Sequence, residues 1–129
     1  MLDDYVPLGA PQTRLYYALR EAVPIIDAAV FKIVRLVGGF TVECGDKAAQ
    51  RELRDFIEDV PVGGNRMGMS AFISSYLEQL LTCGTAVGEI ITDTEGTPRA
   101  LFNTPPDDIT LKRNKNGVDI DIFTGCGPA

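Results

Sequence analysis

Residues 71–92 read AFISSYLEQLLTCGTAVGEIIT, and the period of the hydrophobic pattern changes within this stretch. Before Gly84 the apolar residues recur at a spacing of about 3.6, as on one face of a helix; after it they alternate with a period of about 2, as in a strand. Gly84 is suited to end the helix because glycine readily adopts a left-handed conformation. The helical stripe comprises Ile73, Leu77, Leu80 and Leu81. The stretch therefore predicts a helix over 71–83 and a strand over 85–92.

The sequence N-terminal to this stretch predicts further helices. A short helix is expected over 13–23, and a second over 24–37, where Pro24 suits the first helical position and Gly38-Gly39 supplies a stop. Apolar residues cover most of the circumference of the 24–37 helix, so we expect it at the centre of the core. An Ile33→Asp substitution is then expected to unfold the protein.

The region between these helices predicts a strand and a third helix. Residues 40–44 alternate apolar and polar side chains, which is typical of a strand. Asp46 is a suitable N-cap for a helix that extends to Val60, and Ser70 is a candidate cap for the helix over 71–83. The apolar stripe of the helix after Asp46 consists of Ala49, Leu53, Phe56, Ile57 and Val60.

The C-terminal part predicts two β-hairpins. Residues 85–92 and 99–102 flank a turn at 93–96, and residues 109–114 and 118–123 flank Lys115-Asn116-Gly117. In the last strand Val118, Ile120 and Ile122 are expected to face inward. Three or four helices followed by an antiparallel β meander define an α+β fold. We expect an N-terminal arm or loop over 1–12 and a single α+β domain over 13–129.

The amino-acid composition limits the classes of function that are possible. The chain has 129 residues, of which 45% are hydrophobic and 23% charged, so it should fold as one domain. A net charge of −6 disfavours tight binding of nucleic acid, and the absence of histidine excludes imidazole chemistry. The three cysteines form no CxxC pair, which indicates free thiols and an intracellular protein. Charged residues interrupt the apolar stretch over 22–42, so no membrane span is expected.

No catalytic, cofactor or metal site is predicted. Cys83 lies at the C-terminal end of a helix, where the dipole disfavours a thiolate, and no histidine is available to activate it. The loop at 63–66 has the glycines of a phosphate loop but lacks its Lys-Ser or Lys-Thr pair. The spacing of Asp119 and Asp121 occurs in metal sites, yet alternate carboxylates are also what an exposed strand carries.

Two charged surfaces are candidate contact sites. The helix over 46–60 carries mixed charges that could pair across a subunit boundary or face water; its candidate interface residues are Arg51, Arg54, Asp55 and Glu58. The second hairpin is expected to expose a basic cluster, which is more typical of a solvated turn than of a nucleic-acid site. This basic hairpin consists of Lys112, Arg113 and Lys115.

From Val23 onward the order of features resembles the amino-terminal part of bacteriophage portal proteins, the ring-forming head-tail connectors of tailed phages and prophages. The resemblance is carried by AVPIIDAAV at 22–30, Asn65, the helix containing Phe72, and LLTCGTAVGEII at 80–91. It continues through the turn at Gly96, Leu101 and PPDDI at 105–109. Here Thr85 stands where portals commonly have Asn, and Val87 where they have an aromatic residue.

The resemblance implies a structural role without catalysis. A portal forms a dodecameric ring at one capsid vertex, through which double-stranded DNA passes without sequence-specific binding. It contacts the terminase large subunit, capsid or scaffold proteins and head-completion proteins. Its location is the host bacterial cytoplasm during assembly and then the portal vertex of the virion. No cofactor or membrane is implied.

Portal proteins are several times longer than this chain, so the resemblance implies a fragment that corresponds to the peripheral, wing-like part. In that case strand edges and part of the helix over 24–37 are normally covered by neighbours, and the isolated chain is expected to self-associate. Two alternatives belong to other classes. One is a small standalone intracellular protein-binding module, and the other is a cysteine-dependent enzyme that uses Cys83.

Overall fold

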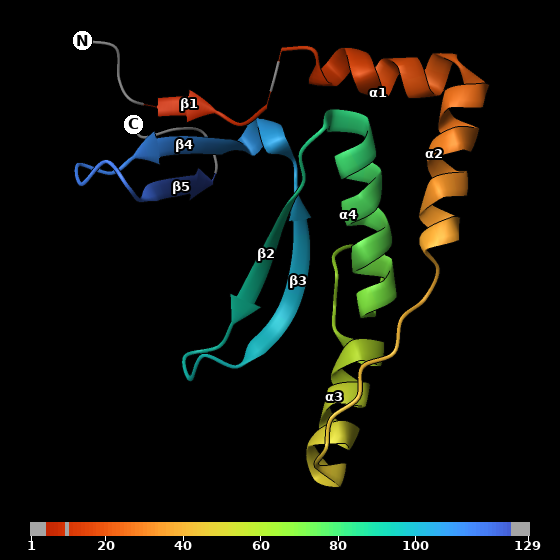
Figure 1. Ribbon diagram of the computed structural model, residues 1–129, viewed down its shortest axis with the longest axis vertical. Helices are drawn as coiled ribbons and strands as arrows, with labels where there is room; N and C mark the ends of the chain where they lie inside the picture. The colour runs from red at the N-terminus through yellow and green to blue at the C-terminus, as the bar shows by residue number, and fades with distance from the viewer. Residues whose placement is uncertain (1–4, 10, 125–129) are drawn as a thin grey trace.

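The computed structural model describes residues 5–9 and 11–124 and has an α+β fold, as predicted. Four helices are present in this part of the chain: α1 (Thr13–Ala22), α2 (Pro24–Val37), α3 (Lys47–Asp59) and α4 (Met69–Cys83). The strands are β1 (Tyr5–Pro7), β2 (Val87–Thr92), β3 (Pro98–Thr104), β4 (Ile109–Arg113) and β5 (Ile120–Thr124). In Figure 1, α2 and α4 run side by side, and the strands lie on the opposite side of α4 from α2.

Local signals placed the helix ends well. Pro24 is the first residue of α2, and Gly84 ends α4 in the left-handed conformation with φ 75°. The Asp46 carboxylate caps α3 by accepting from the backbone N–H of Ala48 at 2.7 Å. The predicted cap at Ser70 is wrong, because α4 begins at Met69, two residues before the predicted start, and its N-cap is Gly68.

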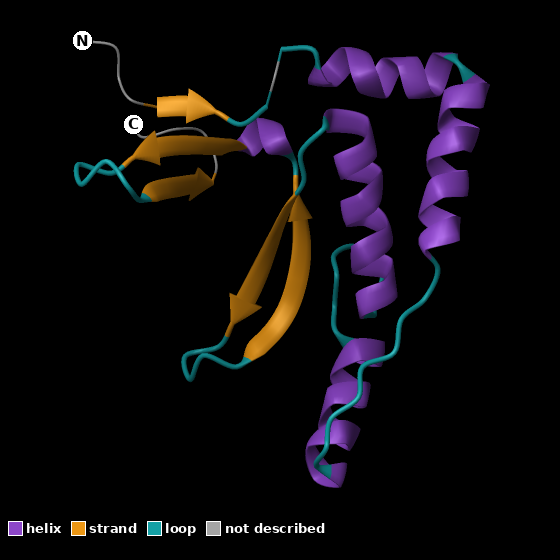
Figure 2. Ribbon diagram, viewed as in Figure 1, coloured by secondary structure: helices purple, strands orange, loops and turns teal. Residues whose placement is uncertain are grey.

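The strands form two sheets rather than one continuous meander. Both predicted hairpins are present, β2–β3 and β4–β5, and both pair antiparallel. A short 3₁₀ helix (Pro106–Asp108) separates them, so β2–β3 remains a two-stranded sheet while β4 lies between β1 and β5 in a second sheet. Figure 2 shows the two sheets in different orientations.

Residues 1–12 were predicted to be an arm or loop, and a short strand lies within them. Tyr5–Pro7 forms β1, which pairs with β4 so that Val6 lies opposite Leu111. Leu8 extends the contact by donating its N–H to the carbonyl of Ile109 at 2.9 Å. Three residues are too few to show a period in the sequence, and the pairing joins segments about a hundred residues apart.

Residues 40–44, predicted as a strand, belong to no sheet. None of the described strands pairs with them. Instead the side-chain amide of Gln50 occupies the position of a neighbouring peptide group: its nitrogen donates to the Val42 carbonyl at 2.9 Å, and its oxygen accepts from the Cys44 N–H. The strand predicted from the alternation of side chains is therefore wrong, and the backbone groups of Val42 and Cys44 pair with a glutamine side chain instead.

The main apolar core is small. Val60, Val62 and Leu101 are buried together where the α3–α4 connection meets β3, and the Leu101 N–H donates to the Pro61 carbonyl at 2.9 Å. Half-buried residues that pack against this cluster are Phe56, Met69, Ala71 and Phe72. Ile109, Pro106 and Val30 are buried outside this cluster. The core therefore lies around the N-terminal end of α4, away from α2.

Two expectations about burial are wrong. Helix α2 lies at the outside of the molecule, with Ile25 76% and Leu36 73% exposed. Val118, Ile120 and Ile122 do not face inward either, since each is at least 60% exposed.

Candidate assembly interface

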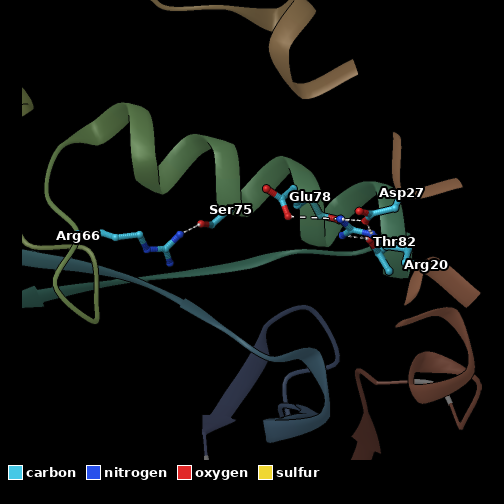
Figure 3. Close-up of polar contacts among 6 residues, drawn as sticks. All are labelled: Arg20, Asp27, Arg66, Ser75, Glu78 and Thr82. Carbon is cyan, nitrogen blue, oxygen red and sulfur yellow. Dashed lines mark hydrogen bonds and ion pairs between the residues drawn. The ribbon is translucent and has the colours of Figure 1, made fainter. Parts of the chain in front are cut away.

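Arg20 joins three helices at the end of α1 (Figure 3). Its guanidinium donates twice to one carboxylate oxygen of Asp27 on α2, from Nε at 2.9 Å and from Nη2 at 2.6 Å. It also donates to Thr82 Oγ1 on α4 at 3.1 Å and lies 3.6 Å from Glu78 Oε2. Because the Arg20 side chain is only 11% exposed, these bonds are poorly accessible to competing water. Arg20 therefore fixes the corner between α1 and α2 against α4.

A hydroxyl and a thiol lie at the same corner. Tyr17 on α1 is hydrogen-bonded with Cys83 on α4, and partial burial together with this bond raises the pKa of Tyr17 to about 12. Cys83 is half-buried, and no histidine exists in the chain to activate its thiol. The Tyr17–Cys83 contact joins α1 to α4 beside Arg20.

This corner determines which side of α2 is exposed. Val30 faces α1 and α4 and is 8% exposed, with Asp27 one turn before it on the same side. Beside Val30, further round the helix, a row of apolar residues has no covering element among the described residues. We call this surface the α2 apolar face; it comprises Ile25, Ile26, Ala29, Ile33, Leu36 and Val37. Exposed Lys32 and Arg35 both lie beyond one edge of it.

An apolar cleft of about 140 Å³ borders the α2 apolar face at Ile26. It lies between α1, α2 and α4, and its size suits one inserted apolar side chain. The lining residues are Tyr16, Leu19, Arg20, Ile26, Val30, Leu81 and Thr82. Leu80 and Leu81, predicted on the buried stripe of α4, are 40% and 42% exposed.

The three-stranded sheet has two different faces. On one face Tyr5 packs against Phe123 with ring centroids 5.7 Å apart, and the Lys112 ammonium lies 4.5 Å from the Tyr5 ring centroid. On the other face Val6, Leu111 and Ile122 form a row of cross-strand partners. We call that surface the sheet apolar face; its apolar residues are Val6, Leu111, Ile120 and Ile122, and exposed Arg113, the cross-strand partner of Ile120, lies on the same face. Val6 is 61% and Ile122 64% exposed.

The predicted basic hairpin does not form a cluster. Lys112 is half-buried in β4 and donates to the Tyr5 hydroxyl at 3.1 Å, while Arg113 is exposed and points to the opposite face of the strand. Lys115 lies in the turn and is exposed. Successive residues of a strand point to opposite faces, so the neighbouring residues Lys112 and Arg113 lie on different faces of β4.

The candidate interface residues of α3 do share a surface. Arg51, Arg54, Asp55 and Glu58 recur at helical spacing and are all exposed. No ion pair joins them to one another or to other residues of the described chain. Arg54 and Glu58 also line a groove of about 310 Å³ between α3 and residues 40–43. Their role in subunit contact stays a prediction.

The described residues offer no cluster of side chains suited to binding a metal. In the part of the chain that the structure describes, no cluster of three or more acidic, cysteine or histidine side chains could bind a metal. Asp119 and Asp121 are both exposed and belong to no such cluster. Cys126 lies outside the described residues. None of the helices in that part is both long and apolar enough to span a membrane.

The fold and these surfaces define an α+β protein with two apolar faces that no described element covers. Comparison with protein families, curated proteins and solved structures finds no match to this chain. The sequence pattern revealed α2 as strongly apolar but misplaced it in the core. It gave no sign of Arg20 as the residue that joins the three helices, since one arginine near a helix end is unremarkable in a sequence.

Proposed function

We propose that this chain is a structural assembly subunit, a wing-like segment of a phage or prophage portal that joins a ring at the capsid vertex. The observation that carries the proposal is the exposure of apolar side chains on α2 and on the three-stranded sheet, among them Ile25, Leu36 and Ile122. A self-sufficient small protein rarely leaves such patches uncovered. The sequence resemblance supplies the choice of a portal among assembly proteins.

The proposal assigns no catalysis to the chain. Its partners are other copies of the portal, the terminase large subunit, capsid or scaffold proteins and head-completion proteins. DNA passes through the ring, and the net charge of −6 supports free sliding because few phosphate contacts would form. The chain acts in the host bacterial cytoplasm during assembly and in the portal vertex afterwards.

Electron microscopy tests the proposal directly. We expect the purified chain, or a longer product of the same gene, to form closed rings when concentrated or mixed with capsid components. The coding sequence should also lie beside terminase and capsid genes. A chain that forms no ring under these conditions and is encoded among unrelated genes would refute the portal role.

The cleft beside Ile26 favours a second candidate, a standalone intracellular protein-binding module. Its volume of about 140 Å³ and its apolar lining suit one anchor side chain of a partner protein. This function predicts a monomer with a sharp and reversible thermal transition. Sedimentation over a concentration series separates it from the portal proposal, which requires association of like chains.

A further inference from the structure

Helices α1 and α2 are attached to the rest of the chain with little apolar packing. Val30 is the one buried apolar residue that they contribute among the described residues. The main core around Leu101 lies at the other end of α4. Where α1, α2 and α4 meet, apolar side chains line the cleft of about 140 Å³ instead of filling it. A part of a protein with few buried apolar contacts opens at a lower free-energy cost than the core does.

The two ends of the α1–α2 pair are held differently. Thr13, the first residue of α1, is buried, so this end of the pair is fixed. After α2, every residue from 38 to 46 is exposed. The Gln50 side chain bonds this segment to α3 through the backbone of Val42 and Cys44. The pair therefore has a fixed end at the start of α1 and, after α2, a connection in which no residue is buried.

Arg20 makes polar contacts both within the α1–α2 pair and between the pair and α4. Its two bonds to Asp27 join α1 to α2 across Val23, the single residue between these helices. Its contacts with Thr82 and Glu78 join the pair to α4 (Figure 3). Charge-assisted bonds of this kind are stronger than bonds between neutral groups. One side chain thus keeps the two helices together and holds both against α4.

The Tyr17–Cys83 contact depends on the same closure. These residues come from α1 and α4 and are hydrogen-bonded. Cys83 is half-buried, whereas Cys44 is exposed in the segment after α2. If α1 moves away from α4, this bond breaks and the Cys83 thiol becomes accessible to solvent. The chain therefore carries a thiol that reports the closed state and an exposed thiol for comparison.

We propose that α1 and α2 form a hinged unit, which pivots at Thr13 and is latched to α4 by Arg20. When the latch is released, the unit moves away from α4 while the core around Leu101 stays folded. Val30 and the Cys83 thiol are accessible in the open state only. The latch therefore controls how much of this corner solvent or a partner can reach. This device does not depend on the portal role.

Native-state hydrogen exchange and thiol labelling test the hinged unit. In a series of low urea concentrations, amides of α1 and α2 should exchange with a weaker urea dependence than the Leu101 amide, which donates to the Pro61 carbonyl in the core. Cys44→Ser and Cys126→Ser leave Cys83 as the only thiol. It should react more slowly than Cys44 does in a chain that keeps only that thiol, but faster than global unfolding allows.

Two variants separate local opening from global unfolding. Arg20→Met removes contacts that are lost in both, so it should raise Cys83 labelling, exchange in α1 and α2 and exchange at Leu101 by a similar factor of about ten or more. Val62→Ala weakens only the core, which stays folded when the latch opens. It should raise exchange at Leu101 by about tenfold or more and leave Cys83 labelling unchanged. Arg14→Met is the matched control for Arg20→Met, since Arg14 is exposed on the same helix.

Several outcomes would overturn the latch. Exchange in α1 and α2 with the same urea dependence as the core amide would show that the unit does not open by itself. A Cys83 rate that Val62→Ala raises, that Arg20→Met leaves unchanged, or that equals the Cys44 rate would refute it as well. Should Arg20→Met fail to fold, Thr82→Val removes one bond of the latch and should raise the Cys83 rate by a smaller factor. The portal role is decided separately, by electron microscopy and gene position.

Discussion

The side-chain amide of Gln79 on α4 is bonded to Thr104 at the open end of the β2–β3 hairpin, with Nε2 donating to the Thr104 carbonyl at 3.0 Å. The oxygen of the same amide accepts from the Val87 N–H at 2.8 Å. Val87 and Thr104 are cross-strand partners, so the glutamine completes the last rung of the hairpin. Gln79 is 8% exposed, which makes it a buried polar link between helix and sheet.

Replacing Gln79 by alanine should lower the free energy of unfolding by about 1–3 kcal/mol, because a backbone donor and acceptor lose their partner in a partly buried place. Urea denaturation measures this loss. The matched control is Gln12→Ala, since Gln12 is exposed at the start of α1 and its side chain makes no capping bond. Equal stability of the two variants would show that the Gln79 bonds contribute nothing net.

A second test concerns the contact between Gly88 and Phe72, which packs α4 onto β2. A Cβ atom added at Gly88 would lie 2.7 Å from Cζ of the Phe72 ring. Gly88→Ala should therefore destabilise the fold by about 1–3 kcal/mol through overpacking. In denaturant unfolding, Phe72→Leu should relieve part of the cost in the double variant. Gly39→Ala is the control, since nothing lies within 4 Å of its added Cβ; a loss as large as that at Gly88 would contradict this account.

Local chemistry accounts for what the sequence predicted correctly. Pro24, Asp46 and Gly84 act through their own backbone or through groups a few residues away, so their effects are visible in a short window. The Asn114–Asp119 hairpin loop is similar, because Gly117 alone supplies its positive φ of 73°. The α+β class follows from the order of such local elements.

Long-range packing accounts for what the sequence missed. An apolar helix indicates burial but does not say by what, and α2 buries only the side that carries Val30. The β1 strand depends on β4, and the segment at 40–44 depends on Gln50; neither partner is implied by the pattern of the segment itself. In the candidate site, the shared surface of the charged α3 residues could be predicted from helical spacing. The separation of Lys112 from Arg113 could not be predicted without knowing that both lie within a pleated strand.

The two sides of α2 allow a matched pair of substitutions. Val30→Asp places a carboxylate in a site that is 8% exposed, which should cost about 3 kcal/mol or more and unfold much of the protein. Ile33 is 46% exposed, so Ile33→Asp should cost under about 1 kcal/mol, contrary to the expectation from the sequence. Thermal unfolding compares them. If Ile33→Asp unfolds the chain as Val30→Asp does, α2 is more buried than described.

The turn of the first hairpin should be sensitive to acid. The pKa of Asp93 lies below its ordinary value of 3.8, chiefly because its carboxylate accepts from the Thr97 N–H at 2.9 Å, with Arg99 as a further partner. A pKa lowered by folding gives stability above 3.8 that is lost as pH falls through the folded value. Amide exchange at Thr97 should therefore rise relative to β4 below pH 3.8. Asp93→Asn should remove this pH dependence, and an unchanged profile would assign it to another group.

Alkaline pH should loosen the corner between α1 and α4. The pKa of Tyr17 is raised from 10.0 to about 12, first by burial and then by its hydrogen bond with Cys83. Because folding raises this pKa, the stabilisation is complete below pH 10.0 and is lost as pH rises toward about 12. Ultraviolet titration of tyrosinate should show one late-ionising residue that Tyr17→Phe removes. Tyr16→Phe serves as the control on the same helix. If the late ionisation persists in Tyr17→Phe, the Tyr17–Cys83 contact does not hold this corner.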